Sequence, residues 1–278
     1  MGAQLNPEAF GGPGMPFGKI QDQLGVFQEH YPPLVIAYLV GLGGWLVASR
    51  LVPEVWPRGP IEWFPRPWRE FGIALVGTVG ILAMGQLWTR GIRQPEQGVF
   101  GPILGAINQV LIFAPILLVV VARRQSWATA WLPRGRVGVR LLVGLGLAAL
   151  AVTAYSLLRA GSDATWVVLS RIWRYDHLDE MTQVFLEDVT IAILFVRLAG
   201  AVGSRWATVL VAFLFAAGHI PAMVSHGATW SELAGLLRDA GLGVAVILVL
   251  QRSRDVVWFW CIHFCLDMTQ FTRVSGVT

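Results

Sequence analysis

Acidic and histidine side chains interrupt three apolar stretches in the second half of this 278-residue chain. Glu187 and Asp188 lie together in FLEDVTIAILFVRL, His219 ends FAAGH, and His263 and Asp267 belong to HFCLD. A carboxylate can take a proton from water, and an imidazole can hold or donate one, so this set could perform general acid–base chemistry. Two histidines with two or three carboxylates would also suit a zinc ion.

The spacing of these residues fits helices. His263 and Asp267 are four residues apart, as are Phe215 and His219, so each pair shares one face of a helix. Pro221 follows His219 by two residues and removes a helical hydrogen bond. We therefore expect the helix to kink or end near His219.

The composition places these helices in a membrane. Hydrophobic residues make up 55% of the chain and charged residues only 14%, with a mean hydropathy of +0.60. Soluble domains carry about 25% charged residues, so disorder, a nucleic-acid-binding arm and an ordinary cytosolic enzyme are excluded. The net charge of +4 comes from arginines at the ends of apolar runs, which predicts no nucleic-acid partner. Cys261 and Cys265 fall on the helix face opposite His263 and are interpreted as packing residues rather than ligands.

Eight segments are candidates for membrane-spanning helices, since about 20 apolar residues cross a bilayer. They cover 34–50, 71–89, 101–122, 139–158, 182–201, 206–225, 233–250 and 255–271. The predicted fold is all-α, a polytopic membrane protein of about eight transmembrane helices with its catalytic core in the last four. Residues 1–33 form a separate segment rich in glycine and proline.

Small residues mark places where these helices can approach closely. Gly101 and Gly105 form a GxxxG pair, and Gly144, Gly146 and Ala148 follow in the next segment. We expect them to serve helix packing only.

An ionised carboxylate at the centre of a lone membrane helix costs about 2.5–3.5 kcal/mol on insertion scales. The acids and histidines must therefore face one another or a wet cavity. The distribution of basic residues gives the orientation: with the N-terminus outside, about thirteen lie at cytoplasmic helix ends, Arg140 and Arg197 among them, and about seven lie outside. The bias favours both termini outside, which places the acid–histidine cluster in the outer half of the bilayer.

In order and spacing, the three motifs resemble those of the CPBP family of intramembrane glutamic endopeptidases, which includes the CAAX prenyl endopeptidases and their bacterial Abi relatives. The family motifs are EExxxR, FxxxH and HxxxN or HxxxD, on successive membrane helices. The resemblance covers residues 130–271, so the chain would divide into N-terminal helices over 34–129 and a protease core over 130–278. Two positions differ: Asp188 stands in place of the second glutamate, and Ala192 stands in place of the arginine. Arg197 is too far along the helix to replace that arginine.

The resemblance implies peptide hydrolysis in the membrane without a cofactor. Glu187 would activate a water that His219 holds, and His263 would donate to the developing oxyanion. Asp188 would tune Glu187 through like-charge coupling, and Asp267 would orient His263. Phe215 would contribute to substrate binding.

Three alternatives stay open. The first is a zinc site, although the sequence has no HExxH motif. The second is a proton-coupled transporter, which also uses intramembrane acids and histidines, although we find no inverted repeat. The third is a catalytically inactive relative that serves as a membrane binding or immunity protein, which Ala192 favours.

The expected setting is the bacterial cytoplasmic membrane, with lipid around the helices. The expected substrate is a protein or peptide with a membrane-embedded or C-terminal tail. An outward-facing site suggests the tails of exported proteins, as for the myxosortase-like members of the family.

Overall fold

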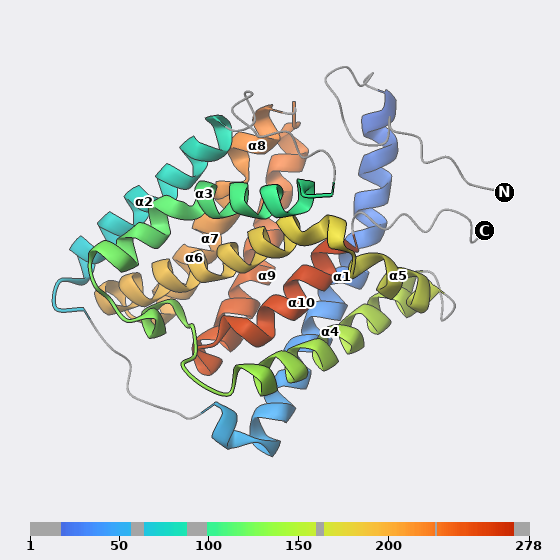
Figure 1. Cartoon of the computed structure of the whole chain (residues 1–278). Coiled ribbons are helices and arrows are strands. Elements are labelled where there is room, and N and C mark those ends of the chain that lie inside the picture. The colour runs from blue at the N-terminus through green and yellow to red at the C-terminus, as the bar shows by residue number, and fades with distance from the viewer. Residues whose placement is uncertain (1–17, 57–63, 88–98, 160–163, 226, 270–278) are drawn as a thin grey trace.

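The computed structural model describes residues 18–56, 64–87, 99–159, 164–225 and 227–269, and every regular element within these ranges is helical (Figure 1). The elements are α1 (Gly18–Leu51), η2 (Pro53–Val55), α2 (Pro67–Leu87), α3 (Gly101–Ala122), η4 (Trp127–Ala130), α4 (Val137–Arg159), α5 (Ala164–Ile172), η5 (Tyr175–His177), α6 (Leu178–Val202), α7 (Ser204–Gly218), α8 (Ile220–Ser225), α9 (Trp230–Ser253) and α10 (Val256–Met268). The predicted all-α class is confirmed for the described chain. The predicted segment 1–33 lies partly outside it, since the description begins at Gly18.

Six stretches of the described chain are helical, long and apolar enough to cross a membrane. They are Tyr31–Leu51, Pro67–Leu87, Gly101–Ala122, Val137–Arg159, Ser204–Ser225 and Glu232–Ser253. Their outer faces carry large exposed apolar side chains, such as Val76 and Leu142 at 72% and 71% exposure. Such continuous apolar surface fits contact with lipid rather than with water.

The other two predicted spans, on α6 and α10, do not meet the same criteria of length and composition, so six of the eight expected spans are found in the described chain. The α6 helix has 25 residues, but its sequence contains five ionisable ones. The α10 helix has only 13 residues, about 20 Å at 1.5 Å per residue. A bilayer core is about 30 Å thick, so α10 is too short to cross it alone.

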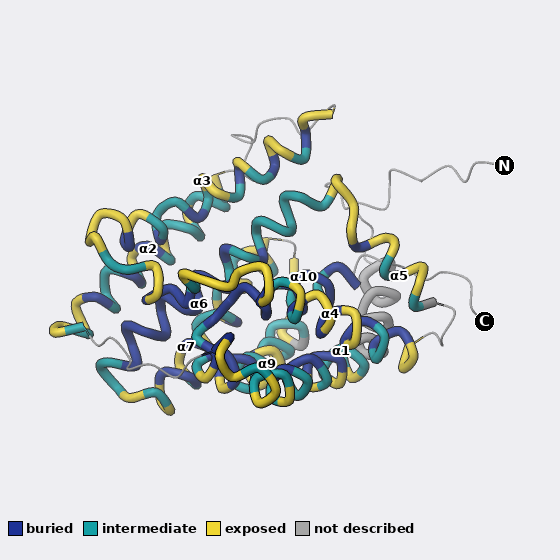
Figure 2. Tube along the Cα trace, turned by 60° about the horizontal axis from the view of Figure 1, so that its bottom comes forward, coloured by how far each residue is buried: buried dark blue, intermediate teal, exposed yellow. Residues whose placement is uncertain are grey.

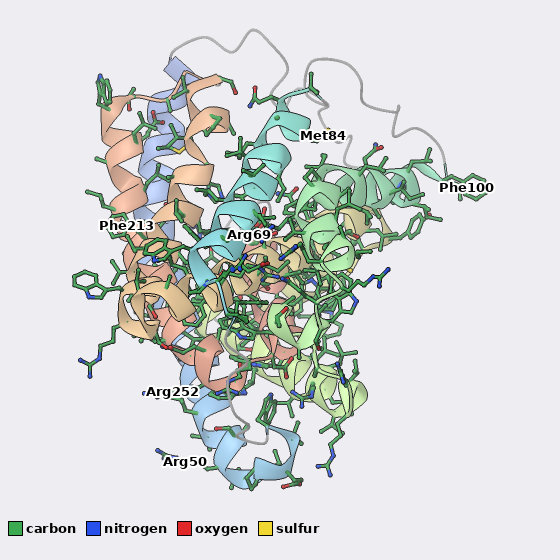
Figure 3. The ribbon with its side chains drawn as sticks, turned by 90° about the vertical axis from the view of Figure 1, so that its left-hand side faces the viewer. Arg50, Arg69, Met84, Phe100, Phe213 and Arg252 are labelled. Atoms are coloured by element: carbon green, nitrogen blue, oxygen red, sulfur yellow. The ribbon has the colours of Figure 1, made fainter. Side chains whose placement is uncertain are left out.

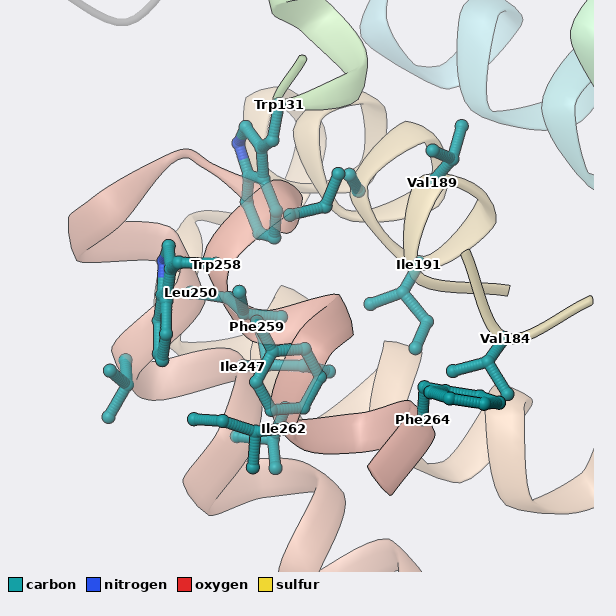
Figure 4. Close-up of a cluster of buried hydrophobic side chains, with 14 of the residues drawn as sticks. Trp131, Val184, Val189, Ile191, Ile247, Leu250, Trp258, Phe259, Ile262 and Phe264 are labelled. Carbon is teal, nitrogen blue, oxygen red and sulfur yellow. The ribbon is translucent and has the colours of Figure 1, made fainter. Parts of the chain in front are cut away.

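These two helices lie in the interior of the bundle. Every residue of α6 from Asp188 to Ala199 is buried, and all of α10 is buried except Trp260, His263 and Asp267, which are partly exposed (Figure 2). Figure 4 shows the buried cluster that α10 forms with α6 and the residues around Trp131. Two of the three helices with the polar motifs, α6 and α10, are thus withdrawn from the lipid-facing surface.

Close backbone contact holds α10 against α4. A Cβ added to Gly144 would lie 2.6 Å from the carbonyl oxygen of Trp258 and 2.8 Å from its Cα, whereas nothing lies within 4 Å of one added to Gly146. Ala148 is also buried, at 1% exposure. The prediction of close packing is confirmed for Gly144, and Gly146 has no such contact.

This difference predicts opposite effects for one substitution at two neighbouring positions. Gly144→Ala forces α4 and α10 apart at a rigid backbone contact, so we expect a loss of about 1–3 kcal/mol in the free energy of unfolding. Gly146→Ala meets no atom and replaces glycine within a helix, so we expect unchanged or slightly higher stability. Thermal unfolding of both variants in detergent tests this. Equal midpoints would show that α4 and α10 do not meet at Gly144.

Polar contacts join many of the helix ends at one end of the bundle, which we call the arginine-rich end. It comprises the C-terminal ends of α1, α3, α6 and α9 and the N-terminal ends of α2, α4, α7 and α10. Asp255, just before α10, accepts hydrogen bonds from the indole of Trp56 at 2.8 Å and from the guanidinium of Arg140. The backbone N–H of Val256 donates to the carbonyl of Trp131 at 3.1 Å.

Two arginines that the sequence analysis placed in connections between helices are instead buried within helices. Arg140 lies in the first turn of α4 and is 8% exposed, and Arg197 lies in α6 and is fully buried. Both still lie toward the arginine-rich end. The difference in arginine content between the two ends therefore persists, but these two residues act as structural partners rather than as loop charges.

Candidate active site

The adjacent acids of α6 have different surroundings. Successive helical residues point about 100° apart, and here Asp188 is fully buried while Glu187 is partly exposed. The Nδ1 of His263 donates a hydrogen bond to Oδ1 of Asp188 at 2.9 Å. This bond fixes the imidazole ring and leaves its Nε2 on the opposite side. We expected Asp267 to orient His263, and the structure adds Asp188 as the acceptor of this hydrogen bond.

Glu187 accepts a hydrogen bond from one amide side chain, which in turn accepts a hydrogen bond from a second amide. The Nε2 of Gln183, one turn earlier in α6, donates to Oε1 of Glu187 at 2.9 Å. The Nε2 of Gln109 in α3 in turn donates to Oε1 of Gln183 at 3.2 Å. A relay of two amides therefore fixes one carboxylate oxygen of Glu187 and leaves the other oxygen out of this contact.

The helix that carries His219 breaks at that residue, as Pro221 predicts. The α7 helix ends at Gly218, His219 caps it, and α8 begins at Ile220. The Nδ1 of His219 lies 3.0 Å from the carbonyl oxygen of Phe215, and the two rings meet edge to face with centroids 5.1 Å apart. The Phe215 carbonyl accepts from Nδ1, which presents the opposite ring nitrogen of this exposed histidine to its surroundings.

Asp267 connects the three motifs through space. Its carboxylate interacts electrostatically with His263 on its own helix, with Glu187 of α6 and with His219 after α7. Together with the Asp188–His263 bond, this places all five predicted acids and histidines in one region. They come from α6, the α7–α8 junction and α10.

Two further residues belong to this region and were not predicted. Tyr38 of α1 is 7% exposed, its ring centroid lies 6.3 Å from that of His263, and it interacts electrostatically with Asp267, Asp188 and Glu187. Asp239 of α9 interacts electrostatically with His219. Asp239 is an acid within the apolar segment 233–250, the same signal that identified the other acids. A single tyrosine in an apolar helix gives no such signal.

Asp239 is itself held by residues of α1 and α9. It shares a side-chain hydrogen bond with Tyr31. The guanidinium of the neighbouring Arg238 lies 5.0 Å from the centre of the Tyr31 ring. The region thus receives polar side chains from α1, α3 and α9 as well as from the three motif helices.

Arg197 does not supply the arginine that the family motif has at position 192. Ala192 is fully buried, and Arg197 lies farther along α6. Its guanidinium donates to the side chain of Gln125 and to the carbonyl of Ile193, and lies 5.0 Å from the ring centre of Phe64. The donor that reaches Glu187 comes instead from Gln183.

Both cysteines are buried in α10 and unpaired. The Sγ of Cys261 lies 3.0 Å from the position of a Cβ on Gly144, so it fills the contact with α4. This fits the predicted packing role.

Within the described ranges, no group of three or more histidine, cysteine or acidic side chains is arranged to hold a metal ion.

Comparison with known proteins identifies no relative: no family model, no curated protein and no solved structure matches the chain.

Proposed function

We propose that this chain is an intramembrane endopeptidase of the CPBP glutamic type, and that it cleaves membrane-associated protein tails with a water activated by Glu187. The observation that carries the proposal is the Asp188–His263 hydrogen bond, and the electrostatic interactions of Asp267 with Glu187 and His219 support it. Residues from three motifs separated in sequence gather in one region, as catalysis by this set requires.

In this mechanism Glu187 takes a proton from water while its other oxygen is held by Gln183. His219 and His263 each have one ring nitrogen occupied, by the Phe215 carbonyl and by Asp188. The remaining nitrogen of His219 would accept a hydrogen bond from the water. The remaining nitrogen of His263 would donate to the developing oxyanion, which requires His263 as an imidazolium paired with the Asp188 carboxylate. A preorganised donor to the oxyanion contributes about 2.7–4 kcal/mol to the activation free energy.

The missing motif arginine is the main difference that this mechanism must accommodate. We propose that Gln183 takes over its orienting role, since its amide donates to Glu187 at 2.9 Å. This neutral amide holds one carboxylate oxygen without adding a positive charge beside it.

The proposed setting is the bacterial cytoplasmic membrane, with the arginine-rich end in the cytoplasm. His263 and Asp267 then lie about 11 and 17 Å along α10 from that end. The site would serve tails that enter from the outer side. A reporter fused to the C-terminus should be active outside the cytoplasm, and activity inside would reverse the orientation.

A membrane proteome comparison tests the proposed activity. Cells that lack the protein are supplied with wild type, Glu187→Ala or His219→Ala at equal levels. We expect uncut C-terminal tails to accumulate with both variants and not with wild type. Unchanged tails in both variants would contradict a protease. Proton-driven flux in vesicles, lost in the same variants, would assign a transporter instead.

The amide relay predicts a graded effect. Gln183→Leu removes the donor to Glu187, so we expect hydrolysis to slow by about tenfold, corresponding to one charge-assisted hydrogen bond. Gln109→Leu acts one step away and should cost about threefold or less. Cleavage of a single-span substrate by purified protein in vesicles measures both. A larger effect at Gln109 than at Gln183 would contradict the relay.

A further inference from the structure

A cavity of about 470 Å³ lies at the arginine-rich end, away from the acid–histidine region. Its walls come from η2, η4, the segment before α4, and the arginine-rich ends of α6, α7 and α9. Four arginines line it: Arg134, Arg136, Arg140 and Arg254. Glu54 is the one acid among its lining residues.

The positive charge of this cavity is only partly neutralised. Arg140 is bound to Asp255, and Arg134 donates to the hydroxyl of Ser126 at 2.8 Å, a neutral partner. Among the lining residues that the structure describes, four arginines stand against one acid, Glu54, and Asp255 pairs with Arg140. Within the described part of the chain, the side chain of Arg136 has no hydrogen-bond or ion-pair partner, and the residue is exposed.

The remaining wall is apolar and aromatic. Trp56 and Trp131 line the cavity with Phe195, Val196 and Ala199 of α6. Indole rings are characteristic of the membrane–water interface, where one side meets polar groups and the other meets hydrocarbon. A ligand here would meet arginines and an apolar wall together.

A second hollow of about 1000 Å³ adjoins the first and shares Trp56, Gln251 and Arg254 with it. It lies between the ends of α1 and α9, and Arg50 and Arg252 add further positive charge (Figure 3). The outer surfaces of these helices carry exposed apolar side chains nearby, Val47 at 56% and Leu248 at 44%. Apolar surface therefore continues from the hollow along the lipid-facing side of the bundle.

We propose that the arginine-rich cavity binds the phosphate of an anionic glycerophospholipid. The arginines would hold the phosphate, the tryptophans would pack on the glycerol region, and the acyl chains would lie along α1 and α9. Basic pockets between membrane helices on the cytoplasmic side recognise such head groups. The apolar continuation beside α1 favours a lipid over free inorganic phosphate, which would use the arginines alone.

Lipid binding by the purified full chain tests this. We expect phosphatidylglycerol to raise the thermal midpoint in detergent and phosphatidylcholine to leave it unchanged. The double substitution Arg136→Gln with Arg254→Gln should weaken phosphatidylglycerol binding about 25-fold, about fivefold for each arginine. Arg140 is left intact because it holds the fold together.

The control is a double variant that also removes two positive charges, but at the end of the molecule opposite the arginine-rich end. Arg171→Gln with Arg174→Gln should leave phosphatidylglycerol binding at the wild-type level. Equal weakening in both double variants, or equal stabilisation by the two lipids, would overturn the proposal. Stabilisation by millimolar inorganic phosphate that matches phosphatidylglycerol would assign the cavity to free phosphate and overturn the lipid assignment. Arg136→Gln alone, with circular dichroism as a check on folding, keeps the test valid if the double variant misfolds.

Discussion

Glu187→Gln should lower the rate of substrate hydrolysis by about 10²- to 10⁴-fold, the usual contribution of a positioned general base. Glutamine has the shape of glutamate but cannot take a proton from water. Its carbonyl oxygen can still accept the hydrogen bond from Gln183, so the fold should remain intact. Cleavage of a single-span membrane substrate by the reconstituted chain measures the rate.

Asp176→Asn is the matched control for this experiment. Asp176 is an acid on the surface, in an exposed ion pair with Arg174 at 2.8 Å. Its neutralisation removes one negative charge and should leave hydrolysis unchanged. Wild-type cleavage by Glu187→Gln would rule out the proposed mechanism, and equal slowing by both variants would point to an effect of charge alone.

Asp255→Ala should lower the free energy of unfolding by about 3–5 kcal/mol, because it leaves a buried arginine without its counter-charge. Asp255 is fully buried and accepts hydrogen bonds from Trp56, Arg140 and the backbone N–H of Val257. Burial raises the pKa of this carboxyl, and the three donors oppose that shift by favouring the charged form. The same residue caps α10, the helix that carries His263.

Chemical unfolding in detergent compares this variant with Asp176→Ala, which breaks an exposed ion pair and should cost about 1 kcal/mol or less. Replacing both buried partners, as Asp255→Val with Arg140→Met, should restore part of the loss because no unpaired charge remains. A double variant less stable than Asp255→Ala would show that the pair is not the source of the effect.

Much of the architecture could be predicted from apolar segments alone. Segment length predicts the all-helical class, and Pro221 predicts the helix break near His219. The cost of placing charges in lipid predicts that Glu187, His219 and His263 lie together. Each of these rests on the local sequence or on a general energetic rule, so no knowledge of the packing is needed.

What could not be predicted depends on how the helices are rotated about one another. The sequence analysis paired Asp267 with His263 and Asp188 with Glu187, and only the rotation of α6 against α10 gives the hydrogen bond from His263 to Asp188. Tyr38 lies near the acids and histidines because α1 packs close to the part of α10 that carries His263. The difference between the eight predicted spans and the six found has a simpler cause: α6 contains five ionisable residues, and α10 has only 13 residues.

The interior position of α6 has a consequence for how the chain enters the membrane. A lone helix with Glu187 and Asp188 near its middle would pay about 5–7 kcal/mol on insertion scales, more than its apolar residues readily offset. Its partners α2 and α3, on which it packs, precede it in the chain. Synthesis therefore delivers part of the protein surroundings of α6 before its acids, whereas His263, which donates to Asp188, is made later. The last helix, α10, is too short to insert alone and packs on α4 and α6, so membrane assembly is complete only once the whole chain has been made.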